Sequence, residues 1–159
     1  MLNLKGIHDM EELEIKTTIQ ISRSQKDVFE GIIQKDRMSN YFISHASGDM
    51  EEGKTVEWTF PEFPGSFPVK VLEVNSPENV IFAWEGIEGS TTTVEIRLEK
   101  VDDSKTVVKI TEGKLGVDEN GILWYGRNTE GWANFLASLK AYLEYDINLR
   151  KGAFDFMKP

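Results

Sequence analysis

The sequence predicts an α+β protein in which a curved antiparallel sheet of about seven strands wraps around one long C-terminal helix. Two observations lead to this fold class. Between residues 44 and 114, apolar side chains recur at every second position in short runs separated by glycine- or proline-containing turns, as is typical of strands. After Gly116 the apolar side chains recur at helical spacing instead. Because the turns are tight, we expect neighbouring strands to run antiparallel.

The chain opens with one strand and two short helices. Residues 14–21 alternate between isoleucine or threonine on one face and mostly charged or polar residues on the other, as in a half-buried strand. Ser22 or Ser24 can cap the next segment, SQKDVFEGII, whose apolar residues recur at helical spacing. A second short helix is expected near residues 35–42, where apolar side chains cluster.

About six further strands follow, joined by tight turns. Gly53 suits the positive φ of a hairpin turn in MEEGKT. The three prolines of FPEFPGSFP (residues 60–68) exclude a central strand at that point. In STTTVEIRLEKV, by contrast, Thr92 and Val94 begin an unbroken alternation that predicts a half-buried strand.

The last element is predicted to be a helix over residues 129–149. Thr129 is a suitable N-cap, and Gly152 suits the position after the helix end. One apolar stripe runs along the helix and comprises Trp132, Phe135, Leu136, Leu139, Tyr142 and Leu143. At roughly 1.5 Å per residue the helix would be about 31 Å long. Seven strands about 4.8 Å apart span a similar width, so this helix can cross the whole sheet.

The composition is that of an ordinary globular protein. The length of 159 residues predicts a single domain over residues 1–159, with a core from about residue 14 to about residue 149. The absence of cysteine excludes disulfides, thiol nucleophiles and cysteine-bearing metal sites. The net charge of −9 disfavours nucleic-acid binding. No apolar stretch is long enough for a membrane span, so we expect a cytoplasmic protein.

Several segments resemble one protein family. TEGWANFLASLKAYLEY (residues 129–145) is similar to the closing helix of the activator-of-heat-shock-protein-90-ATPase homologues, whose Aha-type C-terminal domain is part of the SRPBCC/START-like superfamily. IQISRSQKDVFEGI, EEGKTVEWTF and VIFAWEG resemble the same family, so the likeness covers about residues 14–149. It implies a START-like helix-grip fold with a cavity between the sheet and the last helix. Relatives include chaperone co-factors, lipid or hormone carriers and cyclases, so the resemblance implies no single function.

Large aromatic side chains are expected on both walls of this cavity. The candidate ligand-binding residues are Tyr41, Trp58, Phe60, Phe67, Val69, Phe82, Trp84, Thr92, Val94, Trp132, Phe135 and Leu136. Two interpretations stay open, because the same side chains can line a pocket for an apolar ligand or simply fill the core. The segment at residues 60–68 has the same two alternatives, as a lip over the entrance or as a cap on the core. Tyr41 or Thr92 can supply the polar contact that gives specificity.

The sequence contains no recognisable catalytic constellation. His45 can act as a general base, but a lone histidine without a carboxylate motif is usually structural or exposed to solvent. Glu57 and Glu85 fall on the outward face by alternation. No phosphate-binding loop, nucleophile elbow or metal-ligand spacing is present. We therefore expect no catalytic residues, no metal and no cofactor.

Three functional hypotheses follow. The first is a non-catalytic binding module that holds a hydrophobic small molecule or lipid between the sheet and the last helix. The second is a protein-interaction domain, either co-chaperone-like or a homodimer. The third is a cavity enzyme such as a cyclase, which requires His45 in a pocket or a carboxylate that points inward against the expected alternation.

Overall fold

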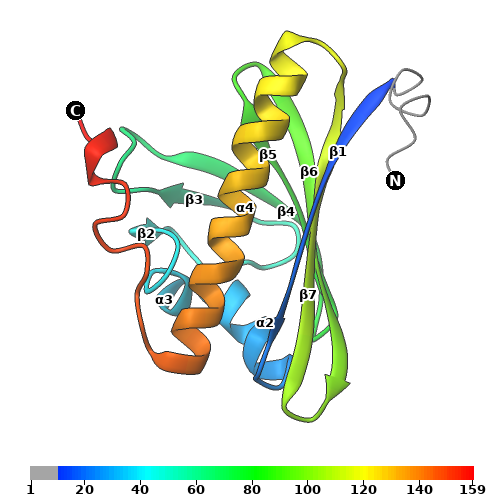
Figure 1. Ribbon diagram of the computed structural model, residues 1–159, viewed down its shortest axis with the longest axis vertical. Helices are drawn as coiled ribbons and strands as arrows, with labels where there is room; N and C mark the ends of the chain where they lie inside the picture. The colour runs from blue at the N-terminus through cyan, green and yellow to red at the C-terminus, as the bar shows by residue number, and fades with distance from the viewer. Residues whose placement is uncertain (1–10) are drawn as a thin grey trace, which may run out of the picture.

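The computed structural model describes residues 11–159 and contains one seven-stranded antiparallel sheet. The strand order is β1-β7-β6-β5-β4-β3-β2, and the long helix α4 lies across one face of the curved sheet (Figure 1). The strands are β1 (Glu12–Ile21), β2 (His45–Ala46), β3 (Thr55–Thr59), β4 (Phe67–Asn75), β5 (Asn79–Ile87), β6 (Ser90–Asp102) and β7 (Lys105–Gly116). The helices are α2 (Gln25–Ile33), α3 (Lys35–Met38), α4 (Glu119–Tyr145) and the 3-10 turn η1 (Asp155–Met157). The predicted helix-grip architecture is confirmed.

The first short helix lies where the sequence places it, and the second starts at the predicted residue but ends at Met38 and not near residue 42. Ser24, one of the two predicted caps, accepts a hydrogen bond at Oγ from the Asp27 amide over 3.2 Å and thereby starts α2. Val28, Phe29 and Ile32 of α2 are buried against the sheet and α4. Together α2 and α3 close one end of the fold (Figure 1).

Strand register places four side chains on the inner face, next to α4. In the β5–β6 pair Trp84 lies opposite Thr92, and in the β6–β7 pair Val94 lies opposite Glu112. A register shift between Glu85 and Ile87 interrupts the β5–β6 ladder just beyond Trp84. Such a bulge bends the strand locally and changes the direction of the backbone.

Helix α4 begins about one-third of its length earlier than predicted. Its N-cap is Asp118, whose Oδ1 accepts a hydrogen bond from the Gly121 amide over 2.7 Å. The expected cap, Thr129, lies inside the helix and donates its hydroxyl to the Tyr125 carbonyl. The helix also ends earlier than expected, at Tyr145, where Asp146 takes a left-handed conformation with φ of 53°. The predicted range of 129–149 is therefore wrong at both ends.

The core fills the space between the inner face of the sheet and α4. Trp58 and Phe82 from the sheet pack edge to face at 5.4 Å, and Trp132 and Phe135 of α4 contact each other at the same centroid distance. After α4 the chain turns back and runs past α3 and β2 towards β3 (Figure 1). No helix within residues 11–159 is long and apolar enough to cross a membrane.

Candidate functional site

The centre of the site is a buried carboxylate. Glu112 lies on β7, is fully inaccessible to solvent and points towards α4. Five side chains from three other elements donate hydrogen bonds to it. The donors are Trp84 Nε1 (2.9 Å), Thr92 Oγ1 (2.5 Å), Trp124 Nε1 (3.4 Å), Asn128 Nδ2 (3.1 Å) and Trp132 Nε1 (2.9 Å).

The pattern of donors matches an ionised carboxylate. Indole and amide N–H groups can only donate, and the carboxylate form of Glu112 can only accept. No lysine, arginine or histidine in residues 11–159 forms an ion pair with Glu112. The negative charge is therefore compensated by hydrogen bonds alone. Such a buried charge is stable only while its hydrogen-bond donors stay in place. Loss of a donor leaves part of the charge without a partner in an apolar environment, which costs free energy.

Gly86 allows the sheet to approach this carboxylate closely. A Cβ atom at position 86 would lie 2.6 Å from Glu112 Oε2 and nearer still to the Thr92 hydroxyl. It would also lie 3.1 Å from the Trp124 indole nitrogen. The absence of a side chain at the β5 bulge is therefore a condition for the donor arrangement.

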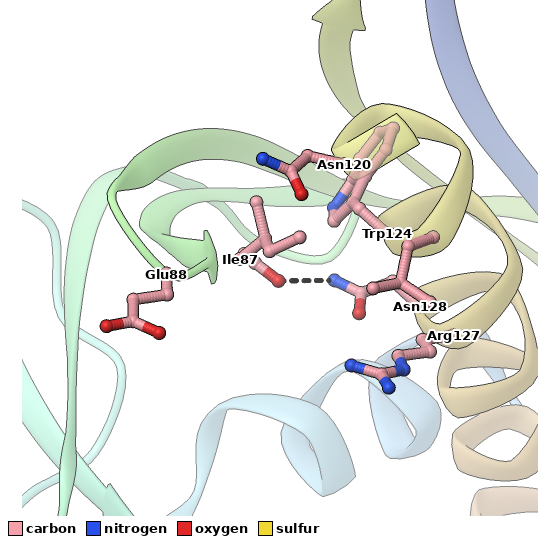
Figure 2. Close-up of a pocket in the computed structure, with 8 residues that line it drawn as sticks. Ile87, Glu88, Asn120, Trp124, Arg127 and Asn128 are labelled. Atoms are coloured by element: carbon pink, nitrogen blue, oxygen red, sulfur yellow. Dashed lines mark hydrogen bonds between the residues drawn. The ribbon is translucent and has the colours of Figure 1, made fainter. Parts of the chain in front are cut away.

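A pocket of about 510 Å³ opens directly beside this network, between the β5–β6 turn and the first half of α4 (Figure 2). It is lined by Gly86, Ile87, Glu88, Asn120, Leu123, Trp124, Arg127 and Asn128. Asn128 connects the pocket to the carboxylate, since its Nδ2 donates both to Glu112 and to the Gly86 carbonyl, each over 3.1 Å. The second of these bonds is the dashed line in Figure 2. Glu112 thus lies behind the pocket wall and holds Trp124 and Asn128 in place.

Charged and apolar groups share the pocket surface. Asn120 and Arg127 extend from α4, and Glu88 extends from the turn that faces them (Figure 2). Arg127 forms no ion pair with any side chain of the described chain. Leu123 is 43% exposed, although it is a large apolar residue. The pocket therefore offers a ligand an apolar contact, amide groups, the Arg127 guanidinium and the Glu88 carboxylate.

The structure brings three predicted site residues together. Trp84, Thr92 and Trp132 all donate to Glu112. The Thr92 hydroxyl is thus already engaged, and the Tyr41 hydroxyl donates to the Gly31 carbonyl over 2.9 Å. Burial raises the pKa of Tyr41 well above its usual value. The polar side chains that face the pocket are instead those of Asn120, Arg127 and Asn128 on α4 and of Glu88 on the β5–β6 turn.

The other predicted residues form the aromatic interior. Seven of them are buried, namely Trp58, Phe60, Val69, Phe82, Val94, Phe135 and Leu136, and Phe67 is half-buried. Rings in this group contact one another, for example Phe60 with Phe67 at 5.6 Å. In the segment at residues 60–68, Phe60 caps the core while Phe63 stays 42% exposed. That this interior opens to hold a ligand stays a prediction.

Sequence reasoning missed Glu112, Trp124 and Asn128. The signal for Glu112 is present, because Val108, Ile110 and Glu112 share one face of β7 by simple alternation. Trp124 and Asn128 precede the predicted helix of residues 129–149, so the sequence predicts no neighbours for them. His45 and Glu85 are exposed, in agreement with the expectation for both.

Comparison with known proteins identifies relatives by family and by structure. Residues 22–144 match the model of the family described as Activator of Hsp90 ATPase homolog 1-like protein. A comparison with curated proteins finds no match. A crystal structure of a Staphylococcus saprophyticus protein is 25% identical with a TM-score of 0.75, and the alignment covers 87% of this chain and 96% of that one.

Two further solved structures share the fold. The Aha1 dimer from Colwellia psychrerythraea is 23% identical, with a TM-score of 0.71 and coverage of 84% of this chain and 97% of that one. An HSP90 activator from Plasmodium falciparum is 21% identical, with a TM-score of 0.65 and coverage of 84% and 96%. At these identities the two structures indicate the fold alone.

Proposed function

The chain belongs to the family of Activator of Hsp90 ATPase homolog 1-like proteins, and from this premise we propose that it binds a small molecule in the pocket beside Gly86 and Asn128. Family membership supports a ligand-binding or co-chaperone-like domain. The observation that favours ligand binding is the position of the pocket on the Glu112 network. Rigid indole and amide groups anchored by a buried charge form a pre-organised wall, which lowers the entropy lost on binding.

The lining defines the chemistry of the proposed ligand. Ile87, Leu123 and Trp124 offer apolar surface, so the body of the ligand is hydrophobic. Arg127 and the Asn120 amide suit an acceptor or anionic group at one end, whereas both N–H groups of Asn128 are already donated to Gly86 and Glu112. We further propose that the apolar part reaches towards the predicted cavity residues Trp84 and Trp132, which lie behind this wall.

A matched pair of substitutions on α4 tests this proposal. Leu123 lines the pocket, whereas its neighbour Ile122 is 58% exposed and does not. The protein is mixed with a panel of lipids and aromatic small molecules while tryptophan fluorescence is followed. Leu123→Glu should weaken binding of any hit at least about tenfold, which corresponds to about 1.4 kcal/mol. Ile122→Glu should leave the affinity unchanged.

Two results would reject ligand binding at this place. One is a panel in which no compound binds to the folded protein. The other is an equal loss of affinity in both variants, because that would locate the ligand elsewhere or indicate a non-specific effect of the added charge.

The second candidate is a protein contact made by the exposed start of α4. Val117, Ile122 and Tyr125 are 47%, 58% and 41% exposed, which is unusual for large apolar side chains so close together in sequence. Similar structures include a dimer and an HSP90 activator. We propose this surface for contact with an Hsp90-type chaperone or a second copy of the chain.

Sizing chromatography and a pull-down with the chaperone separate this candidate from the first. Here Ile122→Glu should disrupt the association and Leu123→Glu should affect it less. This candidate is rejected if the protein elutes as a monomer and the chaperone does not bind it in the pull-down. The organisation of residues 1–159 as one domain and a cytoplasmic location remain predictions that accompany the proposal.

A further inference from the structure

A second site lies beneath the C-terminal segment, residues 146–159. After α4 this segment turns back and passes α3 and β2 on its way towards β3 (Figure 1). A pocket of about 680 Å³ lies between it and the end of the aromatic interior. The segment contributes Arg150 and Phe154 to this pocket, and the body of the protein contributes Phe42 and Glu62.

Arg150 occupies an aromatic enclosure at this place. Its guanidinium carbon lies 5.4 Å from the ring centres of both Phe42 and Phe60, and 4.8 Å from that of Phe154. It forms an ion pair with Glu62, a carboxylate that is only 5% exposed. Aromatic faces around a buried carboxylate are the chemistry that recognises an organic cation.

The parts of this enclosure that do not belong to the C-terminal segment are firmly held. Phe42 packs edge to face on Phe60 at 5.1 Å and on Phe135 at 4.7 Å. These contacts join Phe42 and Phe60 to the core of the fold, so both rings are held by partners outside the C-terminal segment. The net charge of −9 also draws cations towards the protein.

Arg150 fills this enclosure incompletely. Its Nε is buried and has no hydrogen-bond partner within residues 11–159. Burial also lowers the pKa of Arg150, although the charge of Glu62 opposes this effect. An occupant with an unfilled donor is more easily displaced than one whose donors are all paired.

We propose that Phe42, Phe60 and Glu62 form a binding site for a small molecule that carries a guanidinium group, and that Arg150 fills this site as an internal competitor. A ligand displaces Arg150, and the adjoining pocket of about 680 Å³ accepts the rest of the molecule. The site is separate from the pocket beside Gly86 and does not depend on the function proposed for that pocket.

The experiment removes the internal competitor and supplies an external one. Ethylguanidinium at millimolar concentration is titrated into wild type and Arg150→Ala, with ethylurea as the uncharged compound of the same shape. Arg150→Ala should bind ethylguanidinium at least about tenfold more tightly than wild type, because the open form is a minor fraction of wild-type molecules. Neither protein should bind ethylurea.

Two variants make the result decisive. Arg150→Gln keeps a long polar side chain but lacks the charge, so it should also bind ethylguanidinium if Arg150→Ala proves unstable. Adding Glu62→Gln to either variant should abolish binding. The proposal is overturned if the folded variants do not bind ethylguanidinium, if ethylurea binds equally well, or if Glu62→Gln has no effect.

Discussion

The Glu112 carboxylate is surrounded by three indoles, a hydroxyl and an amide, all of which donate to it. Glu112→Gln keeps the shape of the side chain, but its NH₂ group can only donate hydrogen bonds. This group would face the indole, hydroxyl and amide groups that donate to the carboxylate in the wild type. We expect a loss of about 2 kcal/mol in the free energy of unfolding, because at least one buried group loses its partner. Urea unfolding measures the change as a shift in midpoint at constant slope.

Glu99→Gln is the matched control for this prediction. Glu99 lies on β6, is exposed, and pairs with Lys109 at the surface over 2.9 Å. Exposed ion pairs of this kind contribute little to stability, so Glu99→Gln should leave the urea unfolding midpoint unchanged. If Glu112→Gln unfolds at the wild-type midpoint as well, the donors around Glu112 are not contributing to stability.

The residues of the site differ in how far sequence could predict them. Trp84, Thr92 and Trp132 were identified because alternation and helical spacing both place them on inner faces. The same alternation extends to Glu112, but carboxylates are rarely fully buried, so alternation alone does not identify it as a buried residue. A buried carboxylate is recognisable only when its donors are known, and two of them lie on a helical turn that local propensity did not predict.

Helix α4 shows why its start was placed too late. Gly121 and Gly126 interrupt its first turns, and each glycine in a helix costs about 1 kcal/mol relative to alanine. These glycines leave the stretch before residue 129 ambiguous in the sequence, and the predicted helix therefore begins only at Thr129. Burial of Trp124, which is 1% exposed, offsets the cost through tertiary packing that sequence spacing alone does not reveal.

The two glycines should respond in opposite ways to alanine. A Cβ at Gly126 would meet no atom within 4 Å, so Gly126→Ala should stabilise the protein by about 0.5–1 kcal/mol. A Cβ at Gly121 would overlap the Gly116 carbonyl, so Gly121→Ala should destabilise it by about 1–3 kcal/mol. Thermal unfolding of both variants measures whether each substitution raises or lowers the stability. Equal effects would mean that the Gly121 backbone does not lie against the Gly116 carbonyl.

At the scale of the whole molecule, the spacing of apolar residues and the turn residues predict a sheet packed against one helix. They do not predict which distant segments of the chain contact each other. The long strands β6 and β7 carry a clear alternation, and from β2 to β7 each strand pairs with the next one along the chain. No local pattern indicates that Glu144 on α4 meets Ser22 after β1, or that the C-terminal segment returns over Phe42. Such pairings depend on the completed fold.

The contact between the last turns of α4 and the end of β1 should make the free energy of unfolding depend on pH. Glu144 accepts hydrogen bonds from the Ser22 amide and from Lys140, which also donates to the Gln20 carbonyl. Burial raises the pKa of Glu144, but the hydrogen bonds from Lys140 and Ser22 lower it by more than burial raises it. The pKa of Glu144 therefore lies below its usual value of 4.5. The resulting stabilisation is present above pH 4.5 and is lost as the pH falls through the lowered pKa.

Glu144→Gln should therefore lower the free energy of unfolding by about 1 kcal/mol at neutral pH. The difference from wild type should persist down to a pH of about 5 and disappear in stronger acid, where Glu144 is protonated in both the folded and unfolded states. Urea midpoints measured across this pH range test the prediction. Glu130→Gln, at an exposed position on the same helix, should follow wild type throughout. A difference that stayed constant into strong acid would show that Glu144 acts through packing and not through its charge.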